Sequence, residues 1–486
     1  MKDSLSIIKS ESYLSRVSIS LSTKDKIQQK RNTFCRYLPQ CLAVLSASLA
    51  FFSRGLHQGW TSPALPKLLT NGTETNSYFQ ITTEEGSWIV TLYSGSISIG
   101  APVAAFLIFT VGRKTTILFS AVPHLMSLLL IAFAGSVEYL YVARVLAGFS
   151  EGVANIAVPA YVGEIADSNI RGVLSCVYTV LSISGLLLIN IIGSYTTIFQ
   201  TSMICSVFPI LLILTFFWMP ESPYFHLMQN NSKSAEKCLQ QLRGTKNVKT
   251  ELVEITHAVE KQMLNAGTFT DLFTIRSNRR ALQLAIALET IQQLSGITAI
   301  LSYAQIIFIE SGQKMSSEMS SIILMSVQLV MSMIGASVVD RLGRRPLLMF
   351  SCFGCFLALF FEGLYFYFQY IEYQYIDNLF WLPLVALISY FIVYSAGLAI
   401  ILNVYAGEIF STSVKGKALG LVMIWYGILA FFASKLFQKL VDDIGMFVPF
   451  WMYAFSCLLG LIYAYLWVPE TKGKTLEEIQ DWLENN

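Results

Sequence analysis

The chain has 486 residues, of which 54% are hydrophobic and only 13% are charged, with a formal net charge of +2. A soluble globular protein carries about 25% charged residues, so this composition excludes an ordinary soluble domain and indicates a membrane protein. No basic face with interleaved aromatic residues is present, and we expect no nucleic-acid partner.

The apolar runs predict an all-α membrane protein with twelve transmembrane helices. Residues 1–37 are polar, basic and serine-rich, which predicts a cytoplasmic N-terminal tail with no signal peptide before the first span. Each later run approaches the roughly 20 residues that cross the hydrocarbon core. The spans are expected near residues 38–58, 88–110, 115–135, 139–164, 172–194, 200–219, 281–309, 319–339, 346–369, 379–406, 416–437 and 447–468.

A long polar interruption divides these spans into six and six. Residues 220–280 are rich in lysine and glutamate, and helical periodicity in residues 234–242 and 251–263 predicts short amphipathic helices at the membrane surface. We therefore expect two six-helix bundles, residues 38–219 and 281–468, joined by a cytoplasmic linker of residues 220–280. A cytoplasmic tail of residues 469–486 follows the second bundle.

The charged loops predict the orientation. Bases gather in loops on one side of the predicted membrane and acids on the other, so the positive-inside rule places both termini in the cytoplasm. The sequon at Asn71 then lies in a long outer loop, where glycosylation is possible, whereas the sequon at Asn230 lies inside and is expected to stay unmodified.

One charged loop occurs twice. Residues 340–345 read Asp-Arg-Leu-Gly-Arg-Arg between two spans, and residues 111–114 read Val-Gly-Arg-Lys in the first half, which indicates a duplicated, two-bundle protein. We expect Glu164 to pair with arginines of its neighbouring loops and Glu408 to pair with an arginine of the second loop. Such pairs predict a cytoplasmic gate, with static anchoring of helix ends as the alternative. The gate candidates are Arg113, Arg144, Glu164, Arg171, Asp340, Arg341, Arg344, Arg345 and Glu408.

The seventh span carries polar groups within an apolar run. Gln292, Gln293 and Thr298 place amides and a hydroxyl there, and Gly296 permits local unwinding. Buried amides need hydrogen-bond partners, and an amide both donates and accepts, as a sugar hydroxyl does. Gln328 adds another amide in span 8. Each amide could instead join helices by hydrogen bonds.

Other polar and aromatic residues are weaker candidates. Asn403 and Trp425 could contact a sugar, but aromatic side chains also fill cores. Glu289 and Glu151 are intramembrane acids that could relay protons, and His57 is expected to be exposed or hydrogen-bonded. We expect no disulfide framework, and nothing in the sequence indicates an enzyme, a metal site or a cofactor.

These motifs together resemble the sugar porter family of the major facilitator superfamily, from about residue 38 onward. Gly59 to Leu65, and Thr179 in span 5, look like the insect branch of facilitated trehalose transporter-like proteins. The strings that carry the resemblance are Arg144 with Gly148 and Gly152, residues 159–164 with Arg171 and Gly172, and residues 220–223, 292–297, 340–345, 408–410 and 469–479.

The resemblance implies alternating access of the two bundles around a central sugar site in the plasma membrane. Gln292 and Gln293 would bind sugar hydroxyls, and Thr298, Gln328, Asn403, Trp425 and Thr179 stand at further site positions of the family. The expected partners are a small sugar and membrane lipid, and the oligomeric state is not indicated. Facilitated transport of trehalose or a hexose is expected, because Thr61 stands near the position of an aspartate in proton-coupled relatives.

Two alternatives remain open at this point. The chain could be a proton-coupled symporter that uses Glu289 or Glu151. It could also be a non-transporting sugar receptor, because span 10 lacks the prolines that break this helix in relatives. Without those prolines the helix is expected to be straighter.

Overall fold

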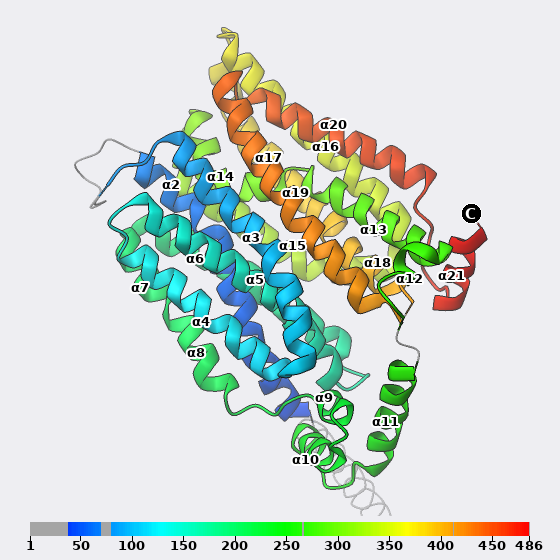
Figure 1. The fold of residues 1–486 in the computed structure, drawn as a ribbon. Coiled ribbons are helices and arrows are strands. Elements are labelled where there is room, and N and C mark those ends of the chain that lie inside the picture. Colours follow the sequence, from blue (N-terminus) through cyan, green and yellow to red (C-terminus); the bar gives the residue numbers. More distant parts are fainter. Residues whose placement is uncertain (1–36, 70–78, 265–266, 412, 486) are drawn as a thin grey trace, which may run out of the picture.

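The computed structural model describes residues 37–69, 79–264, 267–411 and 413–485, with the side chains of residues 336–341, 377, 403 and 485 not described. Figure 1 shows the chain as two groups of long helices that lie side by side, with short helices at one end of the molecule. Within the described ranges every regular element is a helix, which confirms the all-α prediction.

The helices follow the predicted order. A helix over residues 37–59 is followed by α2 (Thr61–Leu69), α3 (Thr83–Thr110), α4 (Arg113–Ala132), α5 (Val137–Ile165), α6 (Arg171–Tyr195), α7 (Ile198–Cys205) and α8 (Val207–Phe216). The linker carries α9 (Pro223–Met228), α10 (Ser232–Arg243), α11 (Lys249–Leu264) and α12 (Asp271–Thr274). Then come α13 (Arg276–Gln293), α14 (Ile297–Glu310), α15 (Ser317–Leu342), α16 (Arg344–Tyr370), the 3₁₀ helix η1 (Ile376–Leu379), α17 (Leu382–Ala396), α18 (Leu398–Glu408), α19 (Lys415–Asp443), α20 (Phe447–Leu466) and α21 (Leu476–Asn485).

Eleven helical segments of the described residues are long and apolar enough to cross a membrane. The helix over residues 37–59 corresponds to the first predicted span. Local chemistry fixes several helix starts: at α3, Thr82 accepts from the Glu85 amide at 3.2 Å while the Glu85 carboxylate accepts from the Thr82 amide at 2.7 Å. This reciprocal capping box satisfies two amides that a helix start leaves without partners.

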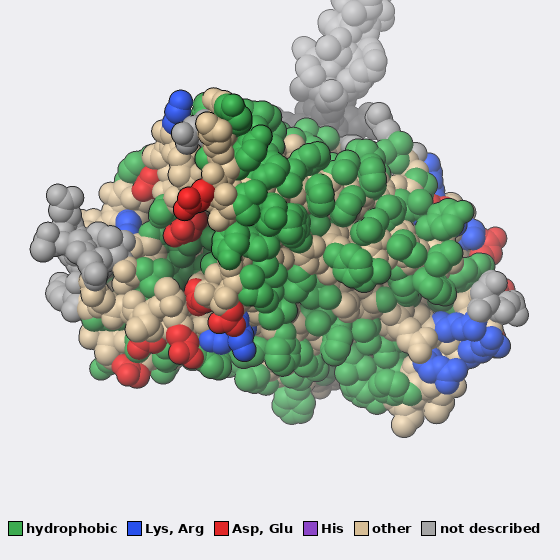
Figure 2. Space-filling model, turned by 90° about the horizontal axis from the view of Figure 1, so that it is seen from above, with side chains coloured by type: hydrophobic (Ala, Val, Ile, Leu, Met, Phe, Trp, Pro, Cys, Tyr) green, Lys and Arg blue, Asp and Glu red, His purple; other side chains and the backbone are tan. Residues whose placement is uncertain are grey.

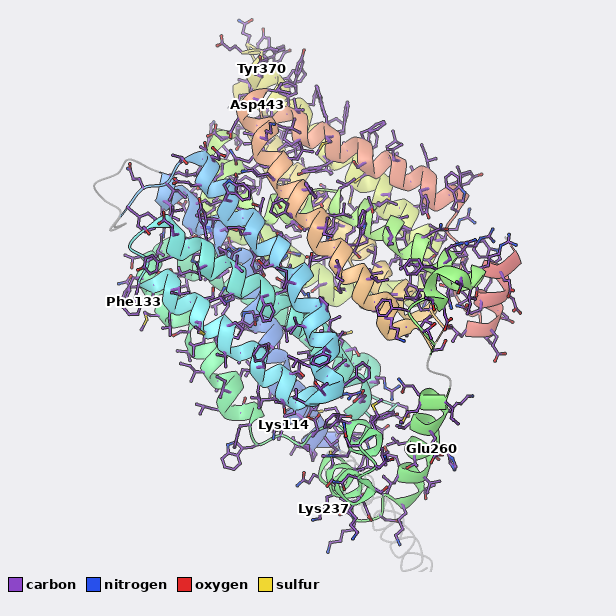
Figure 3. The ribbon with its side chains drawn as sticks, viewed as in Figure 1. Lys114, Phe133, Lys237, Glu260, Tyr370 and Asp443 are labelled. Atoms are coloured by element: carbon purple, nitrogen blue, oxygen red, sulfur yellow. The ribbon has the colours of Figure 1, made fainter. Side chains whose placement is uncertain are left out.

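The molecule has two chemically distinct ends. We call the end that carries α9 to α12 and α21 the linker face, and the other end the opposite face. Lys114, Lys237 and Glu260 lie toward the linker face, whereas Tyr370 and Asp443 lie at the opposite face (Figure 3). Between the ends, hydrophobic side chains form a broad surface band (Figure 2), as expected for helices that contact lipid.

Small residues let the spans of the first half approach closely. Gly148 of α5 lies so near α3 that a Cβ atom at this position would stand 1.9 Å from the Tyr93 carbonyl oxygen. Gly152 lies one turn further along, where a Cβ atom would stand 2.4 Å from the Ile97 carbonyl oxygen. Gly148 and Gly152 therefore form a pair of small residues at the helix–helix contact between α3 and α5.

The tenth span is broken, so the prediction of a straighter helix is wrong. Gly397 separates α17 from α18 with φ −126° and ψ −81°. Ser351 of α16 stabilises the break: its hydroxyl donates to the Val393 carbonyl at 2.7 Å and accepts from the Leu398 amide at 3.1 Å. A side chain from a neighbouring helix thus satisfies backbone groups at a break that contains no proline.

Replacing Gly397 by alanine is expected to destabilise this break. A Cβ atom there would lie 2.3 Å from the Ser351 Cβ atom, so the capping side chain must move away from the amide that it serves. We expect a loss of about 1–3 kcal/mol of unfolding free energy, measured as a lower thermal midpoint in detergent. Gly407→Ala in α18, where a Cβ atom meets nothing within 4 Å, is the matched control and is expected to unfold like the parent. Equal midpoints for both variants would contradict the capping role of Ser351.

The linker folds as helices at the predicted places. α10 contains residues 234–242 and α11 contains residues 251–263, as predicted. Leu239 and Ile255 contribute to a small apolar core that the two helices share with α9. Arg243 joins the two helices through an ion pair with Glu251 at 2.6 Å. Their position on a membrane surface stays a prediction.

The side-chain-to-side-chain hydrogen bonds between the described residues of the two halves lie toward the opposite face. Near this face Lys435 donates to the Ser87 hydroxyl at 2.6 Å, and Gln305 donates to the Ser194 hydroxyl at 2.8 Å. Ser321 donates to the Asn190 amide oxygen at 2.9 Å. The halves are therefore held together on the side away from the linker.

Candidate functional site

The break in the seventh span lies at Gly296. Its φ of +83° is a left-handed conformation that favours glycine, and it separates α13 from α14. A Cβ atom here would stand 2.2 Å from the Tyr453 ring, so both the backbone angle and the packing require glycine. The local unwinding that the sequence predicted is present.

Several predicted sugar ligands gather around this break. The Gln293 side-chain oxygen accepts from the Thr298 hydroxyl at 2.9 Å. Gln292 reaches across to the Leu398 carbonyl at 3.4 Å, just after the break of the tenth span. Trp425 of α19 donates its indole N–H to the Thr290 hydroxyl at 3.0 Å. The two broken helices and α19 therefore share one group of amides, hydroxyls and aromatic rings, which we call the amide cluster.

Three predicted site residues are not joined to the amide cluster by the described contacts. Thr179 lies exposed on α6, which packs against α15 of the second half. Gln328 of α15 is buried, and its side-chain oxygen has no hydrogen-bond partner among the described residues. The side chain of Asn403 lies outside the described part of the structure, as do the side chains of Asp340 and Arg341 and all of Asn71.

The first half contributes an ion pair that the sequence analysis missed. Arg54 in the first helix donates from Nε to Glu151 of α5 at 2.6 Å, and the Tyr93 hydroxyl donates to the other oxygen of the same carboxylate. The signal was present in the sequence, because an arginine in the middle of an apolar run needs a partner or water. Glu151 alone was noticed, as an isolated acid.

A second charged arrangement occurs twice at the linker face. In the first copy, Arg113 pairs with Glu164 at 2.8 Å, and Ser222 donates its hydroxyl to the other Glu164 oxygen. Glu221 accepts from the backbone amides of Arg113 and Lys114 at the start of α4, at 3.0–3.1 Å. A carboxylate at a helix N-terminus satisfies free amides and is favoured by the helix dipole.

The second copy repeats these contacts. Arg344 pairs with Glu408 at 3.0 Å, and Thr471 donates its hydroxyl to the other Glu408 oxygen at 2.6 Å. Glu470 accepts from the amides of Arg344 and Arg345 at the start of α16, both at 3.0 Å. We call each copy a carboxylate cap. The repetition extends to a tyrosine in each half that donates to a proline carbonyl, Tyr161 to Pro220 and Tyr405 to Pro469.

Each carboxylate cap joins segments that belong to the same half of the chain. Glu221 and Glu470 lie just after the last span of their own half, so each cap ties the end of a half to the loop between its second and third spans. Although partial burial opposes ionisation of Glu470, backbone N–H groups of Lys472, Arg344 and Arg345 lower its pKa below the ordinary glutamate value. The carboxylate form that the cap needs is therefore favoured.

Arg144 and Arg171 lie outside the caps. Arg144 is buried toward the other end of α5, where its guanidinium donates to the carbonyls of His57 and Ile89 at 2.8 and 3.2 Å and stacks 4.0 Å above the Tyr93 ring. Arg144 therefore takes no part in the ion pairs of the linker face. Arg171 is exposed at the start of α6 and donates to the Ala166 carbonyl at 3.4 Å.

His57 faces the interior of the first half. It is fully buried, its ring stacks on that of His124 with centroids 5.0 Å apart, and its Nε2 lies 3.3 Å from the His124 carbonyl oxygen. Within the described ranges no three histidine, cysteine or acidic side chains lie together as metal ligands, and the cysteines described are free thiols.

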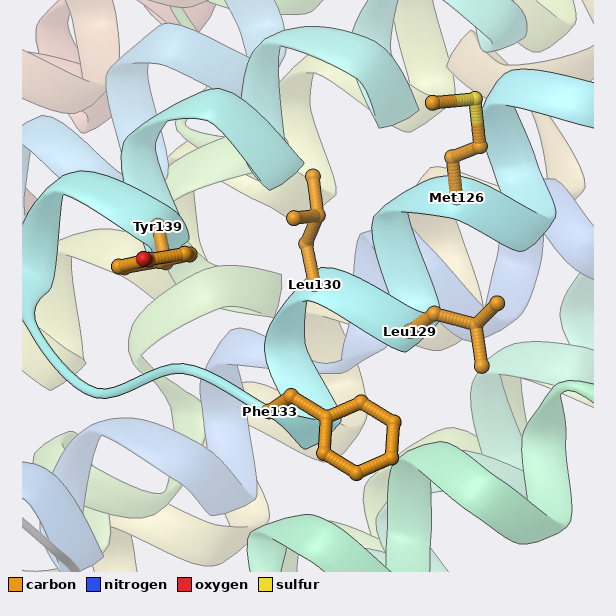
Figure 4. A pocket seen from close by; sticks show the side chains of 5 residues that line it. All are labelled: Met126, Leu129, Leu130, Phe133 and Tyr139. Atoms are coloured by element: carbon orange, nitrogen blue, oxygen red, sulfur yellow. The ribbon is translucent and has the colours of Figure 1, made fainter.

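One hollow lies away from these polar groups. It measures about 280 Å³ and is lined by Met126, Leu129, Leu130, Phe133 and Tyr139 on α4, α5 and the loop between them (Figure 4). Four of its five side chains are purely apolar, and Phe133 is 67% exposed. Because it offers almost no hydrogen-bonding groups, this hollow does not suit a sugar.

A comparison with protein families identifies the chain. The model of the sugar (and other) transporter family matches residues 42–483. The chain belongs to this family. The facilitated trehalose transporter Tret1 of Apis mellifera ligustica is 32% identical over 448 residues, which cover 92% of this chain and 88% of that protein. Tret1 of Polypedilum vanderplanki is 33% identical over 449 residues, with 91% and 87% covered.

Solved structures show the same fold. The inward open conformation of the xylose transporter XylE from E. coli superposes with a TM-score of 0.74 at 22% identity, covering 90% of this chain and 98% of that one. The proton:xylose symporter XylE bound to 6-bromo-6-deoxy-D-glucose gives a TM-score of 0.72 at 22% identity, covering 93% and 100%. This sugar transporter therefore has the major facilitator fold.

Proposed function

We propose that the chain is a facilitative carrier that moves a neutral sugar, trehalose or a hexose, across the plasma membrane by alternating access, with both termini cytoplasmic. The amide cluster carries this proposal. It places groups that both donate and accept at the breaks of two membrane spans, where a sugar can exchange its hydration shell for protein hydrogen bonds. The similarity to Tret1 proteins over nine-tenths of the chain supports trehalose as a first candidate.

The geometry also favours transport over mere binding. The receptor alternative rested in part on the missing prolines of the tenth span, and this span is broken at Gly397 without them. Cross-half hydrogen bonds gather toward the opposite face, whereas the carboxylate caps hold each half together at the linker face. Two internally braced halves that meet on one side can rock against each other. In this proposal the caps keep each half rigid during that motion.

Uptake into oocytes tests the proposal directly. The full chain is expressed, its surface amount is measured, and radiolabelled trehalose and glucose are supplied with and without a protonophore. Saturable uptake that the protonophore leaves unchanged supports the facilitative carrier. Uptake that the protonophore abolishes would instead favour a proton-coupled symporter, for which buried Glu289 and Glu151 are the candidate acids. No uptake of either sugar at normal surface amounts would contradict sugar transport of this kind.

Gln293→Ala is expected to weaken sugar recognition without loss of folding. The side chain is 1% exposed and holds Thr298, so its removal takes one amide from the cluster and releases a second polar group. Losing one such hydrogen bond is worth about 0.5–1.5 kcal/mol, so KM should rise about 3- to 10-fold. Gln283→Ala, at an exposed position of the same helix, is the control. An unchanged KM for the Gln293 variant would remove this residue from the site.

A further inference from the structure

We propose that Arg54 and Gln58 form a sugar subsite on the first half of the chain, in which Glu151 neutralises Arg54 so that its guanidinium donates hydrogen bonds to a neutral sugar rather than attracting an anion. This inference rests on the proposed sugar transport and specifies which residues of the first half contact the substrate.

The two residues lie on the face of the first helix that meets the second half. Arg54 and Gln58 lie four residues apart on the first helix, and Ser62, four residues further, lies at the start of α2, which follows that helix directly and continues the row. Ser62 ends this row with a 3.4 Å contact to the Ser321 hydroxyl of α15. His57 points elsewhere, into the first half against His124. The row therefore faces the second half.

The row leads to the amide cluster. Tyr426 of α19 lies within electrostatic reach of Arg54, Glu151 and Glu289. It directly follows Trp425, which belongs to the cluster, and Glu289 lies one helical turn before Gln293 on α13. Arg54 and the amides therefore lie on two sides of one polar region.

In this ion pair the Arg54 side chain stays partly exposed, whereas the Glu151 side chain is buried. The Arg54 side chain is 21% exposed, whereas Glu151 is only 1% exposed and is bound by Arg54 and the Tyr93 hydroxyl. Gln58 is also partly exposed, and it makes no hydrogen bond to the described residues. The groups that this row offers to a ligand are therefore guanidinium N–H donors and a primary amide.

This chemistry selects a polyhydroxylated neutral ligand. A guanidinium only donates, so it pairs with hydroxyl or acetal oxygens, while the Gln58 amide serves hydroxyls in either direction. A carboxylate would also suit a guanidinium, but here it would compete with Glu151 and approach Glu289. A sugar held by this row and by the amide cluster would contact both halves at once.

Paired substitutions test the proposal in the full chain. Arg54→Gln together with Glu151→Gln removes both charges, so no buried carboxylate loses its partner. We expect KM for the transported sugar to rise about 10-fold or more at a normal surface amount. The same double neutralisation at Arg243 and Glu251, a pair in the linker, is the control and should leave KM unchanged. Gln58→Ala breaks no described hydrogen bond and is expected to raise KM about 3-fold or more.

Competition by a sugar acid supplies the specificity readout. Glucuronate is expected not to compete for uptake by the parent, and to compete at least about 10-fold better in the Glu151→Gln variant, where Arg54 is no longer neutralised. Unchanged KM in both the Gln58 variant and the Arg54/Glu151 double variant, or in the Gln58 variant alone should the double variant not reach the surface, would overturn the subsite. A parent chain that takes up no sugar would instead overturn the proposed function.

Discussion

Gly148→Leu is expected to abolish folding of the transporter. The glycine brings α5 against α3 so closely that a Cβ atom would lie 1.9 Å from a backbone oxygen of Tyr93, and backbone atoms cannot turn aside as a flexible side chain can. Separating these helices would also disturb Tyr93, which binds Glu151. We expect a cost of about 3 kcal/mol or more, seen as aggregation on size-exclusion chromatography and a strongly lowered thermal midpoint.

Gly163→Leu provides the matched control on the same helix. A Cβ atom at position 163 meets nothing within 4 Å, and the backbone there is helical. This variant should elute as a single peak and unfold near the parent temperature. A monodisperse Gly148→Leu variant with an unchanged midpoint would show that the contact between α3 and α5 is not a close-packed one.

Arg344→Ala is expected to reduce transport by at least about 10-fold while the protein still reaches the membrane. The substitution removes the ion pair with Glu408 and leaves that carboxylate with only the Thr471 hydroxyl from the cap. The linker-face ends of α16 and α18 are then no longer joined by a charge pair. We expect engineered cysteines near these ends to react faster with a thiol reagent supplied from the cytoplasm.

The duplicated arrangement supplies a test within the same chain. Arg113 holds the equivalent place in the first cap, so Arg113→Ala should produce a similar loss of uptake. Arg279→Ala, an exposed residue at the start of α13, is the control and should leave uptake unchanged. If both cap variants transport at the parent rate with unchanged cysteine reactivity, the caps only anchor helix ends.

Composition and periodicity were enough to predict much of the fold. Hydrophobic length alone predicted the spans, because the bilayer requires about 20 apolar residues for each crossing. Gly296 marked the break in the seventh span because a polar sequence flanks it within an apolar run. The pairing of Glu164 and Glu408 with nearby arginines followed from the cost of an isolated charge near the membrane.

What the sequence did not reveal depends on contacts between distant segments. The break at Gly397 is supported by the Ser351 hydroxyl from another helix, so neither residue signals it alone. Arg144 donates its hydrogen bonds to backbone carbonyls. Because every residue carries a carbonyl, no partner residue in the sequence indicated where Arg144 lies. The role of Arg54 follows only from the structure, which places Glu151 beside it although the two residues are almost a hundred positions apart in the sequence.

The contacts that join the halves set the energy scale of the transport cycle. Apart from the hydrogen bond of Lys435, the side-chain hydrogen bonds that join the halves toward the opposite face are between neutral hydroxyls and amides, including those of Ser194, Asn190 and Ser321. Hydrogen bonds between such groups contribute only about 1 kcal/mol each. A sugar bound at millimolar affinity releases about 4 kcal/mol. Opening this face and occupying the site therefore involve comparable free energies, and the sugar shifts the carrier between its two orientations only by the difference between its affinities for them.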